Sequence, residues 1–105
     1  MSKKKRMVVV TTDSNRRGVF AGELVKEVKK EFPSGSILWF VTLKNAQMCV
    51  YWSPETHGVL GLAATGPAKG SRITPQVLSI ELDGVTSIMD MTDEAVKKWR
   101  AEPWS

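Results

Sequence analysis

The architecture of this chain depends on Pro33-Ser34-Gly35-Ser36-Ile37-Leu38-Trp39-Phe40-Val41-Thr42-Leu43. The first four residues have the composition of a turn, because short polar residues, proline and glycine adopt the dihedral angles that turns need. The next seven are β-branched, aromatic or aliphatic types, which are enriched in strands. This run predicts a turn that leads directly into a β-strand.

The segment before the turn, residues 19–32, is open to two interpretations. Apolar residues recur at every fourth position from Phe20 to Phe32, which is the spacing of one helical stripe. Two glycines near the start, the lack of a clear cap and the strong strand signal beyond the turn argue against a helix. We favour a long hairpin, with a helix over residues 23–32 as the alternative.

Further strands are expected on both sides of this hairpin. Met7–Thr12 is β-branched and ends in a polar turn, so it predicts a first strand. Lys44-Asn45 predicts a break, after which Ala46–Trp52 carries apolar residues on both alternating faces and predicts a central strand. Val77–Leu82 and Val85–Met89 flank Asp83-Gly84, a sequence typical of a tight two-residue hairpin turn.

Two short helices complete the pattern. Ser53-Pro54-Glu55-Thr56 predicts a helix start with Ser53 as the cap, and Gly66-Pro67 predicts the end of that helix. Leu60, Ala63 and Ala64 would face the core. Its two internal glycines indicate close backbone packing or the approach of a ligand.

A second helix is predicted after Thr92, with acidic residues in its first turn and Lys97, Lys98 and Arg100 in its last. The sum is an α+β domain over residues 7–105. We expect a mainly antiparallel β-sheet or a partly open small β-barrel with two short helices.

Charge is concentrated at the start of the chain. The 105 residues carry a net charge of +4, with 15 Lys and Arg against 11 Asp and Glu. Residues 1–6 form an expected disordered basic tail, whose positive residues are Lys3, Lys4, Lys5 and Arg6. The rest of the chain is therefore neutral. Such a tail either keeps a chain soluble or touches nucleic-acid phosphates without sequence specificity.

Several classes of protein are disfavoured. No apolar run approaches the roughly 18 residues that span a bilayer, and no signal peptide is evident, so we expect a cytoplasmic protein without membrane contact. Cys49 is the only cysteine and lies in an apolar strand, which is typical of an inert thiol. The single histidine, His57, supplies neither a metal site nor an acid–base pair. We therefore expect no catalytic residues, metal or cofactor.

One group of residues forms a candidate ligand site. Aromatic and basic side chains lie close together in sequence around the predicted central strand and its following helix: Tyr51, Trp52, His57, Lys69 and Arg72. If they converge on one concavity, they would bind a phosphate-bearing small molecule by stacking and charge-assisted hydrogen bonds. The alternative is that Trp52 is part of the core and His57 lies on the surface.

Two further segments are weaker candidates for anion binding. Residues 61–71 resemble a nucleotide-hydrolysing phosphate loop, but Pro67-Ala68 stand where Lys and Ser or Thr are required. Backbone amides of this loop, with Lys69 and Arg72, could still hold an anion, and an ordinary solvated connection is the alternative. Arg16 and Arg17, in the first turn, could clamp a phosphate, and a solvated turn is the alternative.

Tryptophan content points to self-association. Four tryptophans fall in four separate elements: Trp39, Trp52, Trp99 and Trp104. That number exceeds what one small core needs, and aromatic residues are enriched at interface centres. We expect a homo-oligomer.

Five segments resemble small uncharacterised proteins of tailed phages and prophages. They are residues 17–22, 45–52, 58–63, 84–88 and 92–96, and the resemblance runs from Arg17 to Trp104. It implies a hairpin after Ala21-Gly22 and supplies no functional residues.

These observations support three hypotheses, all non-enzymatic. The first is an anti-defence sponge that sequesters a nucleotide-derived signal. The second is a nucleic-acid-binding accessory protein that uses the basic tail, and the third is an inhibitor that docks on a host protein through exposed tryptophans.

Overall fold

The computed structural model describes residues 5–13 and 18–101. These residues form the following elements: β1 (Met7–Thr12), β2 (Val19–Glu31), β3 (Ile37–Tyr51), the 3-10 helix η1 (Pro54–Thr56), α1 (Gly58–Ala64), β4 (Arg72–Ile73), β5 (Val77–Leu82), β6 (Val85–Asp90) and α2 (Asp93–Ala101). The predicted α+β class is confirmed.

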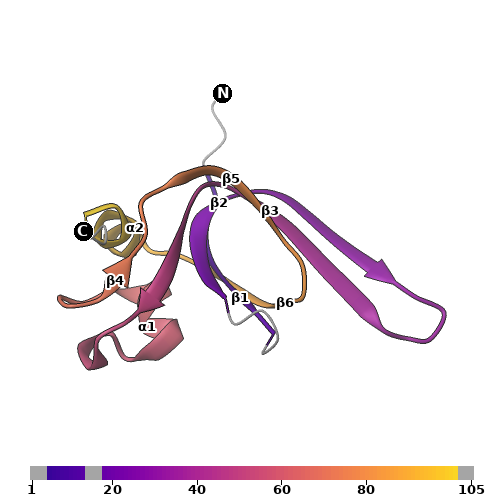
Figure 1. Ribbon diagram of the computed structural model, residues 1–105, viewed down its shortest axis with the longest axis horizontal. Helices are drawn as coiled ribbons and strands as arrows, with labels where there is room; N and C mark the ends of the chain where they lie inside the picture. Colours follow the sequence, from indigo (N-terminus) through magenta and orange to yellow (C-terminus); the bar gives the residue numbers. More distant parts are fainter. Residues whose placement is uncertain (1–4, 14–17, 102–105) are drawn as a thin grey trace.

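All strand pairings are antiparallel, in the order β4-β3-β2-β1-β6, and β5 also pairs with β3. The sheet curls into a half-barrel, and both α-helices lie at one end of it (Figure 1). The predicted partly open barrel is therefore correct.

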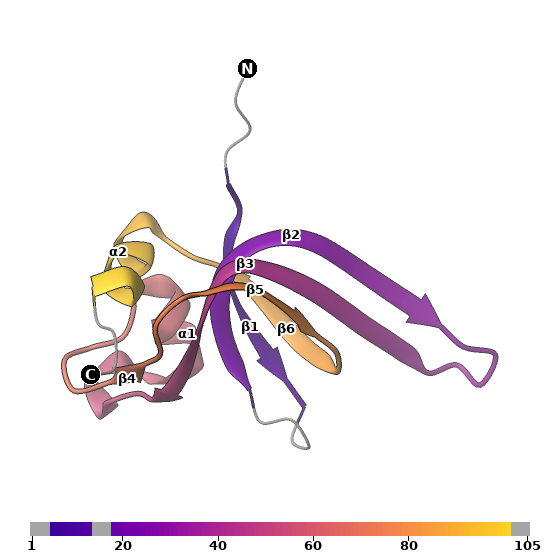
Figure 2. The same ribbon diagram turned by 45° about the horizontal axis from the view of Figure 1, so that its top comes forward.

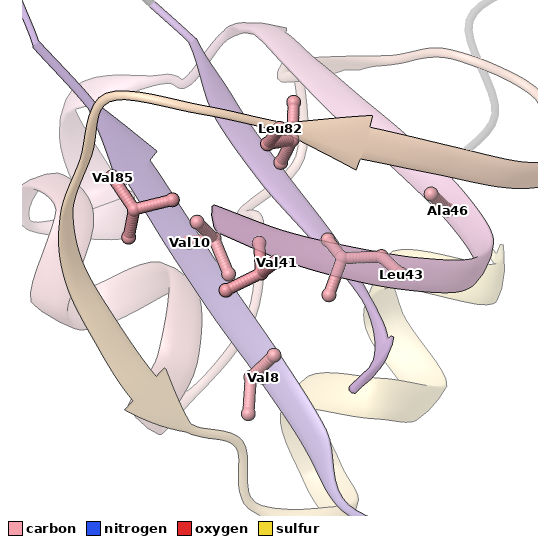
Figure 3. Packing of buried hydrophobic residues seen from close by; sticks show 7 residues of the cluster. All are labelled: Val8, Val10, Val41, Leu43, Ala46, Leu82 and Val85. Carbon is pink, nitrogen blue, oxygen red and sulfur yellow. The ribbon is translucent and has the colours of Figure 1, made fainter. Parts of the chain in front are cut away.

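The inner face of the curled sheet holds one hydrophobic cluster. Its buried side chains converge from β1, β3, β5 and β6 (Figure 3): Val8, Val10, Val41, Leu43, Ala46, Leu82 and Val85. Burial of such aliphatic side chains contributes roughly 1.5–3 kcal/mol each. This cluster holds the curled strands together.

A second cluster lies between the opposite sheet face and the helices. Its buried members are Val9, Ala21, Cys49, Leu62, Ala63, Ile73 and Trp99. Because β1 contributes Val8 and Val10 to one cluster and Val9 to the other, both of its faces are buried. Its unbroken valine run follows from that position, since a strand buried on both faces does not alternate.

The long hairpin is confirmed, and the helical alternative for residues 23–32 is wrong. β2 pairs with β3 from Phe20↔Met48 to Glu31↔Ile37. The predicted break at Lys44-Asn45 is also wrong, because β3 is continuous there. Asn45 adopts φ 52°, which places a left-handed residue in the β3 segment where the register with β2 shifts.

Beyond the body, β2 and β3 pair only with each other. The last β1 partner on β2 is Glu23, and the β5 pairing on β3 begins at Val41. We call residues 26–40 the arm. Figures 1 and 2 show it projecting away from the helices.

The predicted hairpin over residues 77–89 is wrong in its pairing. Both strands form, but β5 pairs with β3 and β6 pairs with β1. Gly84, at φ 66°, connects them across the open side of the half-barrel, and Leu82 and Val85 both enter the inner cluster. Asp83 and Gly84 define a local bend only. Burial of Leu82 and Val85 in the inner cluster favours pairing of β5 with β3 and of β6 with β1 over pairing with each other.

The first helix begins later than predicted. Ser53 makes no side-chain cap bond, and His57 interrupts the segment with φ 64° before α1 starts. Leu60 is 73% exposed instead of facing the core, and Ala64 is exposed too, whereas Ala63 is buried.

One internal glycine of α1 has a packing role. A Cβ on Gly61 would lie 1.6 Å from the Thr56 carbonyl oxygen, so this glycine permits close backbone packing. In α2, the cap is confirmed, because the Thr92 hydroxyl accepts the Ala95 amide hydrogen at 3.0 Å.

Candidate functional site

A hollow of about 460 Å³ lies at the base of the arm, and we call it the arm groove. It is bounded by β2 and β3 on one side and by the end of β5 on the other. Its lining residues are Lys26, Val28, Lys30, Phe40, Val41, Thr42, Glu81, Leu82 and Asp83.

Strand register explains why most of these side chains share one face, while Val41 and Leu82, which pair with each other, belong to the inner cluster. Lys26 pairs with Thr42, and Thr42 pairs with Glu81, so these three residues form a row across three strands. The neighbouring row pairs Val28 with Phe40. Directly opposite residues project from the same face of a sheet. The groove therefore has an apolar floor beside a row that carries both signs of charge.

A register shift in β2 places Lys26 and the residues after it on the groove face instead of the inner face. Leu24 packs against the inner cluster, and residues two apart on a regular strand would share its face. The register shifts between Leu24 and Lys26, which places Lys26 opposite Thr42 on the other face. Val25, between them, is 51% exposed.

The opposite face of the arm is organised around Trp39. The Trp39 indole Nε1 donates a hydrogen bond to Glu27 Oε2 at 2.9 Å. Lys29 Nζ lies 4.5 Å from the centre of the Trp39 ring, within the range of a cation–π contact. These contacts hold Glu27 and Lys29 on the face opposite to Lys26 and Val28.

The sequence-predicted ligand residues lie at the other end of the molecule, around β4 and α1 (Figure 1). Tyr51 is the register partner of Arg72 and is 50% exposed. His57 and Lys69 are exposed, whereas Trp52 is half-buried and packs on the second cluster. The structure thus pairs Tyr51 with Arg72 and gives Trp52 a packing role.

A buried hydroxyl lies within this same segment. Ser53 is 6% exposed, and its Oγ has no hydrogen-bond partner among the described residues. Its backbone amide donates to Ser71 Oγ at 3.0 Å, which ties the end of β3 to the loop before β4.

The remaining predicted site residues are divided. Lys3, Lys4, Arg16 and Arg17, together with Trp104, fall outside the described residues. Lys5 is exposed. Arg6 forms a 2.7 Å ion pair with Asp90, and this contact raises the pKa of the guanidinium.

Cys49 has the properties of the predicted inert thiol. Its side chain is buried, and desolvation raises its pKa to about 11. Within residues 5–13 and 18–101, no group of three or more His, Cys, Asp or Glu side chains is placed to hold a metal ion. No helix in that part of the chain is long and apolar enough to cross a membrane.

The arm groove is not among the sites expected from the sequence. The available signal was the contrast between the charged run Lys26–Glu31 and the apolar run Ile37–Phe40 on the other side of the turn. A hairpin packed fully on a core would carry apolar residues in both strands.

The family comparison covers nearly the whole domain. A model described as a domain of unknown function (DUF6948) matches residues 5–99. No curated protein and no solved structure matches the chain.

Proposed function

The chain belongs to the DUF6948 family, and because that description carries no activity, we propose from the geometry that it is a non-catalytic protein-binding module. The arm groove would hold a polypeptide segment of a partner protein. The observation that carries the proposal is the hollow of about 460 Å³, which joins an apolar floor to charged side chains of both signs.

The composition of the groove favours a polypeptide over other ligands. Val28 and Phe40 offer apolar surface, on which a partner's aliphatic or aromatic side chain can be buried. Lys26 and Glu81 lie in one row and offer one charge of each sign. A nucleic-acid backbone presents only negative charge, so the carboxylate of Glu81 would oppose it. A polypeptide can satisfy both signs.

Site-specific photo-cross-linking tests the proposal. A photoreactive residue at Val28 should form adducts with polypeptide in cells that express the chain, and the additional substitution Phe40→Asp should abolish them. Val77 is the matched control position, because it is a β-strand valine with 51% exposure outside the groove lining. Adducts with nucleic acid alone, or equal labelling at Val28 and Val77, would contradict a protein-binding groove. Chains of two isotopic masses distinguish self-adducts from partner adducts.

A second candidate function uses the end of the molecule around β4. The half-exposed Tyr51 is the register partner of the exposed Arg72, and the buried Ser53 hydroxyl lies two residues beyond Tyr51 along the chain. This arrangement supports binding of a phosphate-bearing small molecule. Such binding is what a sponge that sequesters a nucleotide-derived signal would require. Calorimetry with nucleotide second messengers tests it. Binding that Arg72→Ala abolishes would support the sponge, and no heat with any nucleotide would eliminate it.

A further inference from the structure

The two edges of the arm differ in the number of charged residues that would hinder pairing with another strand. On β2, five of the six residues in Lys26–Glu31 are charged, whereas the β3 segment Ile37–Phe40 contains no charge. Among the described residues, neither edge has a partner strand beyond the hairpin itself. Ile37 is 63% exposed.

This difference identifies the edge that is suited to pairing. An open edge presents unpaired backbone N–H and C=O groups, and soluble proteins usually protect it with charged residues, proline or a bulge. The β2 edge has that protection and the β3 edge does not. A two-stranded ribbon is also only marginally stable in water by itself. An additional strand along β3 would satisfy both requirements.

We propose that Ile37–Phe40 pairs antiparallel with the same segment of a second copy, about a two-fold axis at Leu38. In an antiparallel pair, directly opposite residues project from the same face of the sheet. A two-fold axis perpendicular to the sheet must therefore place one residue opposite the same residue of the second copy, because an axis between two residues would pair side chains from opposite faces. Centring on Leu38 pairs Leu38 with itself, Ile37 with Trp39 and Phe40 with Ser36. Centring on Trp39 would require Val41, whose edge is already taken by Leu82.

The second copy is the occupant because the segment is complementary to itself. The central cross-strand pairs are all apolar, and such pairs contribute roughly 0.2–1 kcal/mol each relative to alanine pairs. The two-fold contact uses each open β3 edge once, so the assembly closes as a dimer and does not extend into a filament.

The dimer also has a consequence for the arm groove. A two-fold axis perpendicular to the shared sheet keeps equivalent faces on the same side, so the two grooves lie on one surface. The dimer does not depend on the protein-binding function proposed above, and it gives the homo-oligomer expected from the sequence a specific interface.

A cysteine placed on the axis tests the register. In the Leu38→Cys variant, two thiols would face each other with Cβ atoms about 4.5–5.5 Å apart, close enough for a disulfide to form with a small adjustment. The native Cys49 is buried and does not compete. Mild oxidation should yield a covalent dimer. The matched control is Val28→Cys, on the protected edge and 39% exposed. Equal cross-linking of both variants, or none at Leu38→Cys, would overturn the register.

Charge substitution tests the association itself. Native mass spectrometry should show a dimer for the wild type, monomers for Leu38→Lys and for Leu38→Glu, and a restored dimer when these two variants are mixed. Val28→Lys should stay dimeric. Circular dichroism shows whether each variant is folded. A monomeric wild type, or a dimer that persists in Leu38→Lys, would refute the proposal.

Discussion

Single residues determine where the arm leaves the body. Asn45 takes a left-handed conformation in the middle of β3, and Val25 is the extra residue where the β2 register shifts. Bulges bend a strand and increase its local twist. The extra residue Val25 lets the inward-facing Leu24 precede Lys26, which faces the groove.

Cys49 gives a residue-scale prediction about pH. Burial raises the pKa of its thiol from 9.0 to about 11, so the unfolded chain loses this proton at a lower pH than the native protein. The protonated thiol therefore contributes stability that is fully present below about pH 9 and is lost as the pH rises towards 11. We expect the free energy of unfolding, measured in urea, to fall over this range.

The Cys49→Ala variant separates this effect from the titration of other groups. It should be less stable than the wild type at neutral pH because it loses buried volume, and its decline with alkaline pH should be shallower. Parallel declines for the two proteins would show that Cys49 does not cause the pH dependence.

At the scale of elements, Gln47 joins the sheet to α2. This residue is 3% exposed, and its Nε2 donates to the carbonyl oxygens of Thr74 at 3.1 Å and Trp99 at 3.0 Å. Its Oε1 accepts a hydrogen bond from Arg100 Nη1 at 2.6 Å. The side chain therefore connects β3, the loop after β4 and the end of α2.

Replacing Gln47 by leucine should destabilise the protein by about 1–3 kcal/mol, because buried carbonyl groups would lose their donor. Urea unfolding measures the change. Gln76→Leu is the control, since Gln76 is exposed and should tolerate the substitution. A similar loss in both variants would mean that the hydrogen bonds of Gln47 contribute little to stability.

The positions of strands with strong β-propensity or clear turn residues were predictable from the sequence. Which strands pair with each other was less predictable. β1, the β2–β3 turn and the Thr92 cap follow from propensity and turn chemistry. The pairing of β5 with β3 does not, because Asp83-Gly84 specifies a bend and says nothing about which strand lies alongside. The continuity of β3 through Asn45 was missed because a bulge and a loop share the same residue types.

The candidate site was harder to predict. Sequence analysis grouped Tyr51 with Arg72 by their places around the central strand, but it did not predict β4, the strand that makes the two residues register partners. The arm groove depends on the register among three strands, and residues as distant in sequence as Lys26 and Glu81 contribute to it. The alternation of apolar and polar residues predicts which face of a strand a residue occupies, but it does not predict where two paired strands extend beyond the neighbouring strands of the sheet.

At the scale of the whole molecule, the body and the arm have separate roles. Both buried clusters belong to the body, and the arm contributes Trp39 only at the margin of the inner cluster. In Figure 2 the arm extends well beyond the other strands. This division indicates that the body folds without the distal arm, whose apolar and charged residues are available for binding.

Shortening the arm tests this division. Val28 and Phe40 are direct partners, so an Asn-Gly turn can join them in place of residues 29–39. We expect the shortened chain to unfold cooperatively with a loss below about 2 kcal/mol, because only the partial packing of Trp39 is removed. It should be monomeric, since Ile37–Trp39 are absent. Thermal unfolding by circular dichroism and native mass spectrometry measure both properties. A shortened chain that fails to fold would show that the arm supports the half-barrel, whereas a folded dimer would place self-association on the body.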